Sequence, residues 1–463
     1  MSGFSLLSAC GAADGDGYTG GAMKRALLHA SLLLIVVASA EAQNTSDDLP
    51  VLDSFVTRAA SPADFDVQGV RIHCGDETHT GWSNDDTFIA GCPSKTPDIG
   101  QRVAVYGKGS KDRTSIAAVK IVLYPPDLGQ LSSAAVIDAT PEPDPAGAPA
   151  NSILLRADGY RILVTPQTRV HFISTLQSLQ QVDSNVWIVY KGRQRADGVV
   201  LADEARFSPN TFSPADEKLR DKVDYDPAAA SSVPRQSAFR ADFEGVDFKR
   251  IPPWPDTAMQ ERVNRIGESL VPAYQKRLPE DDPSKINFRF EVVHGNWGPV
   301  PAALPDGTIL VPHEAVERMQ SDSQLAALIA DGIACVLEKQ AMRLRLTVRM
   351  LTAGETAAGI ASILPFVNLV GLPATFALGS RDLAVVRTEM HQSERVSLTL
   401  LRDAGYDIQQ APVAWWILLQ WKQSKRGSST PRIAATMPEP AVYLYQTLDS
   451  LWRPAGAAAP EPH

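Results

Sequence analysis

The stretch that decides the fold class of the C-terminal half is residues 323–335, with the sequence SQLAALIADGIAC. Its apolar side chains follow one another with few interruptions, so we expect a long, buried helix over residues 325–346. Gly332 stands inside this helix, although Gly is less favourable there than Ala by about 1 kcal/mol. Asp331 and Cys335 flank the glycine at a spacing of four residues and therefore share one helix face.

Residues 253–453 surround this stretch with further helix and strand patterns. Residues 259–270 place apolar side chains at helical spacing, and residues 383–404 predict a second long helix. Residues 288–293 and 308–311 have strand patterns, and a Pro-Asp-Gly turn precedes the second of them. We therefore expect a mainly α (α+β) domain.

Four motifs in this domain carry a resemblance to a known family. They are, in chain order, QERVNRIG at 260–267, ALPDGTILV at 303–311, SQLAALIA at 323–330 and LLRDAGYD at 400–407. They resemble the opening helix, the strand before the metal helix, the approach to the His-Glu-x-x-His motif and the end of the third-ligand helix of zinc metallopeptidase family M-48. That family includes the CAAX prenyl proteases and HtpX. The resemblance covers roughly residues 255–420 and implies a gluzincin-like metallopeptidase fold.

The resemblance also implies where a zinc site would lie. Two His four residues apart hold the metal in the family, a Glu after the first His is the general base, and an acidic residue on a second helix is the third ligand. Here Asp331 and Cys335 replace the two His, Gly332 replaces the base, and Gln392 occupies the third-ligand position. A carboxamide is a poor zinc ligand and Gly332 has no side chain. We therefore expect no catalytic residue, no zinc cofactor and no zinc-dependent proteolysis.

One alternative metal site stays open. Asp331 and Cys335 keep the four-residue spacing and both can bind zinc, and His391 lies one residue before the third-ligand position. On a helix, however, His391 would point about 100° away from Gln392. A helix turn with an ordinary surface carboxylate and a buried thiol is the simpler interpretation, because cysteines are commonly buried. The alternative function is then an active zinc metalloendopeptidase that uses displaced residues.

The N-terminal half contains an internal repeat that predicts two all-β domains, over residues 43–128 and 129–210. Gly69-Val70-Arg71-Ile72 is followed by Thr78, and Gly159-Tyr160-Arg161-Ile162 is followed by Thr168 at the same offset. Both units resemble small OB-like barrels of unknown function from exported proteins. Such barrels can bind oligonucleotides or sugars. A ligand-binding or structural role of these domains is therefore a third hypothesis.

Two cysteines in the first of these domains are candidates for a disulfide. Cys74 and Cys92 would close a loop of about 19 residues, which contributes roughly 3 kcal/mol. The alternative is two separate thiols.

Residues 1–42 have the pattern of a cleaved signal peptide. Lys24 and Arg25 precede an apolar run, and Ala40-Glu41-Ala42 supplies a cleavage site. Met23, directly before the basic pair, is the expected start of translation. The predicted location is therefore periplasmic or secreted, where disulfides persist.

The remaining segments bear on partners. The net charge of −9 and the lack of a basic patch argue against nucleic acid. The uncharged run from Thr356 to Ser380 contains Pro and Gly, so a buried or membrane-touching hairpin is favoured over a single span. Residues 211–252 are expected to be a linker and residues 454–463 a disordered tail. We thus predict an exported pseudo-metallopeptidase that binds a protein or peptide partner, or acts as a scaffold, in the cell envelope.

Overall fold

The computed structural model describes residues 50–112, 114–126, 128–222, 225–227, 251–295, 299–343, 380–424 and 439–451. The expected signal peptide, most of the run from Thr356 to Ser380 and the expected tail lie outside the described residues. In the part of the chain that is described, no helix is both long and apolar enough to cross a membrane.

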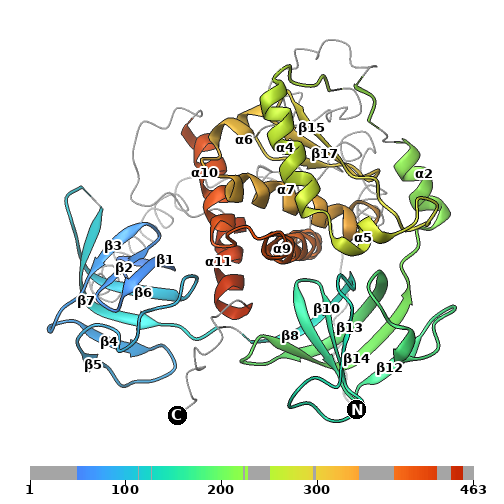
Figure 1. Cartoon of the computed structure of the whole chain (residues 1–463). Helices are drawn as coiled ribbons and strands as arrows, with labels where there is room; N and C mark the ends of the chain where they lie inside the picture. The colour runs from blue at the N-terminus through green and yellow to red at the C-terminus, as the bar shows by residue number, and fades with distance from the viewer. Residues whose placement is uncertain are drawn as a thin grey trace, which may run out of the picture. The chain divides into compact units, whose positions relative to one another are not determined.

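The first β-rich unit contains a closed five-stranded barrel, which we call the first barrel (Figure 1). The described residues of this unit form seven strands, five of which close the barrel: β1 (Leu52–Ser61), β2 (Asp64–Val67), β3 (Val70–His73), β4 (His79–Trp82), β5 (Ile89–Ala90), β6 (Arg102–Gly109) and β7 (Ser115–Leu123). The closed path runs β1-β2-β3-β7-β6 and back to β1, with β3 and β7 parallel, while β4 pairs with β7 and β5 with β4. Alternate apolar residues, among them Val56, Phe65 and Ile121, fill its interior.

The second β-unit repeats this connectivity. Its elements are β8 (Gln130–Val136), β9 (Glu142–Pro143), β10 (Ile153–Ala157), β11 (Tyr160–Val164), β12 (Arg169–Phe172), the short 3-10 turn η1 (Leu179–Gln181), β13 (Val186–Gln194) and β14 (Val199–Pro209). β11 and β14 pair in parallel as β3 and β7 do, and β12 pairs with β14 as β4 does with β7. One difference stands out. β1 forms a ladder with β2, whereas β8 forms none with β10, and the residues just after β8, Ile137 and Asp138, meet Ala157 and Arg156.

The repeated sequence motifs occupy equivalent places in the two units. Gln68-Gly69 and Asp158-Gly159 both have positive φ angles, 51° and 74° in one turn and 57° and 72° in the other. Such pairs form the tight turns that suit the twist of a hairpin. The hydroxyls of Thr78 and Thr168 donate to the carbonyls of Ala118 and Ala202, at 2.9 Å and 2.7 Å. Local turn chemistry and these threonine bridges therefore explain why the motif recurs.

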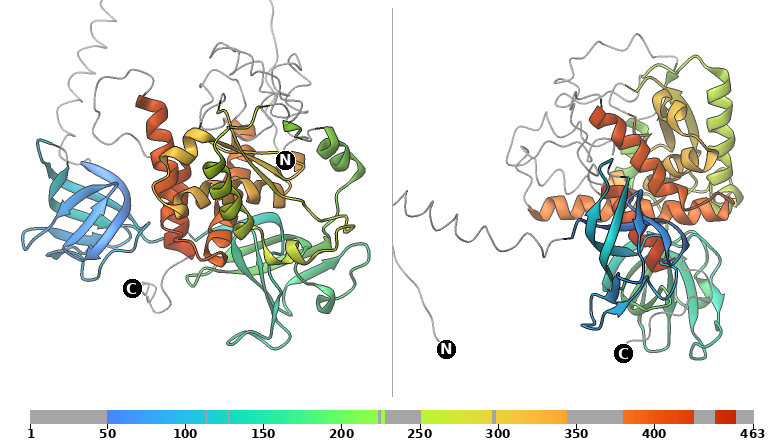
Figure 2. Two further views of the ribbon diagram at one scale, coloured as in Figure 1. Left: turned by 45° about the horizontal axis from the view of Figure 1, so that its top comes forward. Right: turned by 90° about the vertical axis from the view of Figure 1, so that its left-hand side faces the viewer.

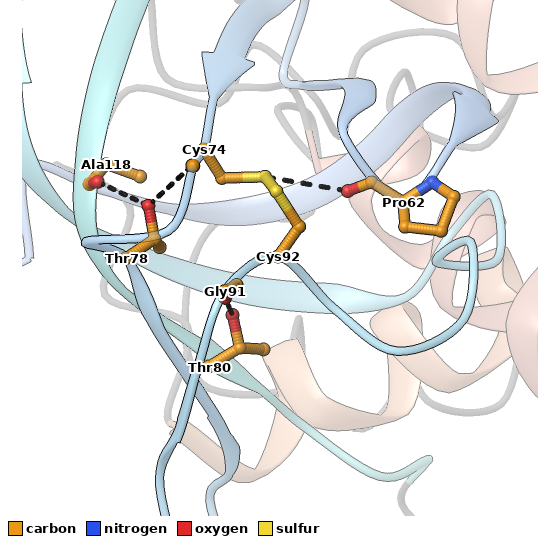
Figure 3. The surroundings of a disulfide bond; sticks show 8 residues. Pro62, Cys74, Thr78, Thr80, Gly91, Cys92 and Ala118 are labelled. Carbon is orange, nitrogen blue, oxygen red and sulfur yellow. Dashed lines mark hydrogen bonds between the residues drawn. A yellow bond between two sulfur atoms is a disulfide. The ribbon is translucent and has the colours of Figure 1, made fainter.

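The disulfide predicted between Cys74 and Cys92 is confirmed, with the two Cα atoms 5.5 Å apart (Figure 3). It joins the end of β3 to the segment after β5. Hydrogen bonds of Thr78 to Ala118 and of Thr80 to Gly91 secure both sides of it. The bond therefore ties the short β4–β5 hairpin to the barrel, as is typical of proteins that fold in oxidising compartments.

The C-terminal region is mainly helical. It comprises α4 (Thr257–Leu270), α5 (Ala273–Arg277), β15 (Arg289–Val293), β16 (Ala302–Ala303), β17 (Thr308–Pro312), α6 (His313–Arg318), α7 (Asp322–Leu337), α9 (Ser380–Asp403), α10 (Gln410–Ser424) and α11 (Glu439–Leu451). The sheet has the order β15-β17-β16, with β15 and β17 parallel. Helices α4, α9 and α10 all pack against α7, which is the centre of the group (Figure 2).

Helix α7 ends earlier than its sequence pattern predicts. Ser321 caps its N-terminus by accepting from the amide of Gln324. The predicted helix is broken after Leu337, because Lys339 has a φ of 53° and interrupts the ladder, and helical backbone resumes at residues 340–343. Side chains from both β-units, Phe55 and Val136, join the apolar core around α7.

The expected linker is partly structured. α2 (Pro214–Lys222) lies within residues 211–252, where only a linker was expected. Ser213 and Asp216 explain this helix. The amide of Asp216 donates to the Ser213 hydroxyl, while the Asp216 carboxylate accepts from the Ser213 amide at 2.9 Å, and Pro214 takes the first helical position.

Candidate functional site

Asp331 and Cys335 lie on the face of α7 that meets α9. The hydroxyl of Ser393 on α9 interacts with both side chains. Burial raises the pKa of Asp331 to about 6, and the Ser393 hydroxyl opposes that shift. Burial, with the nearby carboxylate of Asp331, raises the pKa of the Cys335 thiol well above its usual range. A thiol held in its neutral form is a poor metal ligand and a poor nucleophile.

Gly332, at the position where the resemblance would put the general base, faces the sheet. A Cβ atom built on it would lie 3.1 Å from Cγ2 of Ile309 on β17 and 3.9 Å from Cβ of Ala303 on β16. The glycine thus permits a close contact between α7 and the sheet. The position is filled by packing, and a carboxylate there would collide with Ile309.

Gln392, at the position where the resemblance would put the third ligand, contacts the second β-unit. Its Nε2 donates to the backbone carbonyl of Ala134 on β8 at 2.9 Å. Its Oε1 accepts from Nη1 of Arg343 at 2.5 Å, and Arg343 also donates to Ala134 O at 3.2 Å. Both ends of the carboxamide are therefore occupied by hydrogen bonds within the fold.

His391, the third member of the alternative metal site, is also engaged elsewhere. Its ring stacks flat on that of Tyr443 from α11, with the ring centroids 3.7 Å apart and an angle of 3° between planes. Across the described ranges, no group of three or more His, Cys, Asp or Glu side chains is arranged to hold a metal ion. Asp331, Cys335 and His391 are not brought together.

A small pocket opens beside Cys335. Lys339 and Met342 line it on one side and residues 303–305 on the other. Its enclosed space is about 10 Å³, enough for roughly one water molecule. Such a space does not admit a peptide side chain.

The structure reveals a polar interface between α9 and the second β-unit. One face of α9 contacts both β8 and the turn between β10 and β11, two segments that form no ladder with each other. Gln392 binds β8, and Arg395, one turn later, donates Nε to the carbonyl of Asp158 at 3.1 Å and Nη2 to its carboxylate at 2.5 Å. No local sequence signal connects residues that lie more than 230 positions apart.

An aromatic group on the first barrel was also missed by the sequence analysis. Nζ of Lys120 lies 4.1 Å from the ring centre of Phe88 and 5.5 Å from that of Tyr106. Lys120 lies on β7, Tyr106 on β6 and Phe88 in the loop before β5, so their spacing along the chain gives no hint of the cluster.

Comparisons with known proteins add no relative. No protein-family model matches the chain, and no curated protein matches it in sequence. The likeness to zinc metallopeptidases therefore rests on the four sequence motifs.

Proposed function

We propose that this chain is an exported, non-catalytic relative of zinc metallopeptidases that binds a protein or peptide partner. On this proposal the helical region is a gluzincin-like domain that has lost its metal, and the two β-units are OB-like modules. The single observation that carries it is that both ends of the Gln392 carboxamide are engaged in hydrogen bonds within the fold. The residue in the third-ligand position holds strand β8 through Ala134 O, with Arg343 as its neighbour.

The α7 positions support the same proposal. Asp331 and Cys335 interact with Ser393, and Gly332 packs on Ile309. Each replacement suits a packed interface between α7, α9 and the sheet. Hydrolysis would need a base beside a bound water, and position 332 supplies no side chain for it.

Zinc analysis together with a protease assay tests this proposal. Full-length protein from zinc-replete culture is dialysed and its metal content measured, and cleavage of unfolded casein is followed with and without a chelator. We expect far less than one zinc per chain and no chelator-sensitive cleavage. Stoichiometric zinc that is lost in Cys335→Ser and in His391→Ala, but kept in the surface control His171→Ala, would establish the displaced metal site instead.

A second candidate function rests on the aromatic group of the first barrel. Lys120 between Phe88 and Tyr106 resembles the aromatic and cationic surfaces on which OB-type barrels bind sugars. We propose oligosaccharide binding there as the alternative. A glycan-array comparison of the wild-type chain with Phe88→Ala tests it, with Phe172→Ala in the second β-unit as the control.

A further inference from the structure

We propose that Glu338, Arg343 and Gln392 form a site that binds an extended peptide strand through its backbone, and that β8 of this chain is its resident occupant. We call these three residues the strand clamp. This inference rests on the proposed function, because it names the class of partner, an extended peptide with small side chains, and the place where that partner binds.

The first argument is the pattern of hydrogen bonds. The amide of Val136 donates to Oε2 of Glu338 at 3.2 Å. The carbonyl of Ala134 accepts from Gln392 at 2.9 Å and from Arg343 at 3.2 Å. The clamp thus contacts the backbone N–H and C=O groups of residues i+2 and i on one edge of a strand. An added strand in a sheet is recognised by the same alternation.

The second argument is the position of β8 in its sheet. β8 is the terminal strand of the order β8-β13-β14-β11-β10-β9, so one edge of it has no strand ladder. The amide of Ile137 donates to Val186 on the β13 side, which leaves Val136 and Ala134 facing the other way. An exposed edge of this kind is a template for pairing, and here side chains of the helical region cover it.

The third argument is that two members of the clamp, Arg343 and Gln392, are held in place without β8. Arg343 forms an ion pair with Glu389 at 2.7 Å and a hydrogen bond with Gln392, both within the helical region. Gln340 donates to the carbonyl of Glu389 at 2.5 Å and fixes the segment before Arg343 to α9. Groups that hold one another in place bind a ligand at a lower cost in conformational entropy.

The occupant also indicates what the clamp accepts. Residues 132–136 are Ser-Ser-Ala-Ala-Val, and Ala135 and Val136 are buried. The small side chains let the strand backbone approach α9 closely. We therefore infer that a competing segment is extended, rich in Ala, Ser and Val, and free of proline at the position of Val136, where an N–H is needed.

The test loosens the second β-unit without touching the clamp. A Cβ atom at Gly159 would lie 2.7 Å from Cβ of Arg395, so Gly159→Ala pushes the β10–β11 turn away from α9. Gly69→Ala is its matched control. It imposes a side chain on the equivalent turn at nearly the same φ, but its Cβ meets Trp416 at an ordinary 3.4 Å. Asp158→Ala is a second loosening variant, which removes the partner of Arg395.

The probe is a fluorescein-labelled peptide with the sequence of residues 130–137, followed by anisotropy on the full-length chain. Hydrogen exchange at residues 134–138 reports in parallel whether β8 has left the clamp. We expect the loosened variants to expose these amides and to bind the peptide at least about 10-fold more tightly than wild type, because the resident strand no longer competes. Gly69→Ala should match wild type. Adding Gln392→Leu to Gly159→Ala should abolish the gain, as should N-methylation of Val136 in the peptide.

Two results would overturn the inference. One is release of β8 in the exchange data with no gain in peptide affinity. The other is that neither loosened variant releases β8, which makes the strand a permanent part of the fold. Neither result contradicts the proposed non-catalytic function, because that proposal is tested by zinc content and protease activity. Chelator-sensitive cleavage of the labelled peptide would instead contradict the proposed function itself.

Discussion

Nη2 of Arg395 lies 2.5 Å from the carboxylate of Asp158, and both side chains are almost entirely buried. Tyr190 donates its hydroxyl to the second carboxylate oxygen of Asp158 at 2.8 Å, and the ring of Tyr160 lies 4.8 Å from the guanidinium. The pair therefore connects the β10–β11 turn to α9 in surroundings that exclude water. Burying two charges costs desolvation energy, so the pair adds little net stability. Its main effect is to fix the orientation of the β10–β11 turn on α9.

We expect Arg395→Met to lower the free energy of unfolding by about 3–5 kcal/mol, because it leaves Asp158 as a buried, uncompensated carboxylate. The double variant Arg395→Met with Asp158→Asn should be less destabilised than the single one. Urea denaturation monitored by tryptophan fluorescence measures both. Arg102→Met is the control, since its pair with Asp53 is exposed and should contribute about 0–1 kcal/mol. Equal losses at the two sites would contradict the difference in burial.

A carboxylate at position 332 should destabilise the protein without creating activity. Gly332→Glu places a side chain against Ile309, and overpacking of this kind costs roughly 1–3 kcal/mol. Adding Ile309→Ala should recover part of the loss in thermal denaturation by making room. Gly332→Glu that is as stable as wild type would show that α7 does not pack on the sheet as described.

At position 339, a glycine variant should be more stable than an alanine variant. Its φ of 53° costs about 1–2 kcal/mol in a residue with a side chain. Its Nζ donates to Thr211 O at 2.9 Å and lies 4.6 Å from the ring centre of Phe212. Lys339→Ala and Lys339→Gly both lose these contacts, but only Lys339→Gly removes the strain. We therefore expect Lys339→Gly to be the more stable of the two by about 1 kcal/mol in urea denaturation. In the strand control Lys191, the order of the Gly and Ala variants should reverse.

The contribution of Asp331 to the free energy of unfolding should fall as the pH rises from about 4 to about 6. Burial raises its pKa from 3.8 to about 6 in the folded protein. The folded chain therefore keeps this proton in a range where the unfolded chain has lost it, so ionisation favours unfolding by up to about 3 kcal/mol above that range. Burial likewise raises the pKa of Asp138 to about 6, so Asp331→Asn should reduce the slope rather than abolish it. Thermal unfolding between pH 4 and pH 7 measures this, with the exposed Asp86→Asn as control. An unchanged slope in Asp331→Asn would contradict the prediction.

Reduction of the Cys74–Cys92 bond should destabilise the first barrel. Opening its loop restores chain entropy to the unfolded state and costs about 3 kcal/mol. Unfolding with and without reductant measures the difference. Reductant should have no effect on the variant Cys74→Ser with Cys92→Ser. It should still act on Cys335→Ser, because Cys335 is a free, buried thiol.

Part of the fold follows from local sequence alone. Gly69 and Gly159 supply the positive φ of two equivalent turns, and Thr78 and Thr168 follow at one offset, so the repeat is visible without a structure. Gly405, with a φ of 79°, ends α9 in the motif at 400–407. The end of α7 was not predictable in this way, because a lysine at position 339 gives no helix-stop signal. Contacts of the Lys339 side chain with Thr211 and Phe212 offset the backbone strain at this position.

By itself, the sequence determined that position 332 has no side chain, that Asp331 and Cys335 share one face of a helix, and that Cys74 and Cys92 lie close enough along the chain to pair. Only the tertiary structure decided which partners the buried polar side chains contact. Gln392 meets Ala134, and Arg395 meets Asp158, across more than 230 residues of chain. The physical reason is that turns and helix faces depend on near neighbours in sequence. The partner of a buried polar side chain depends on how whole elements dock, and burial then requires that a partner be found.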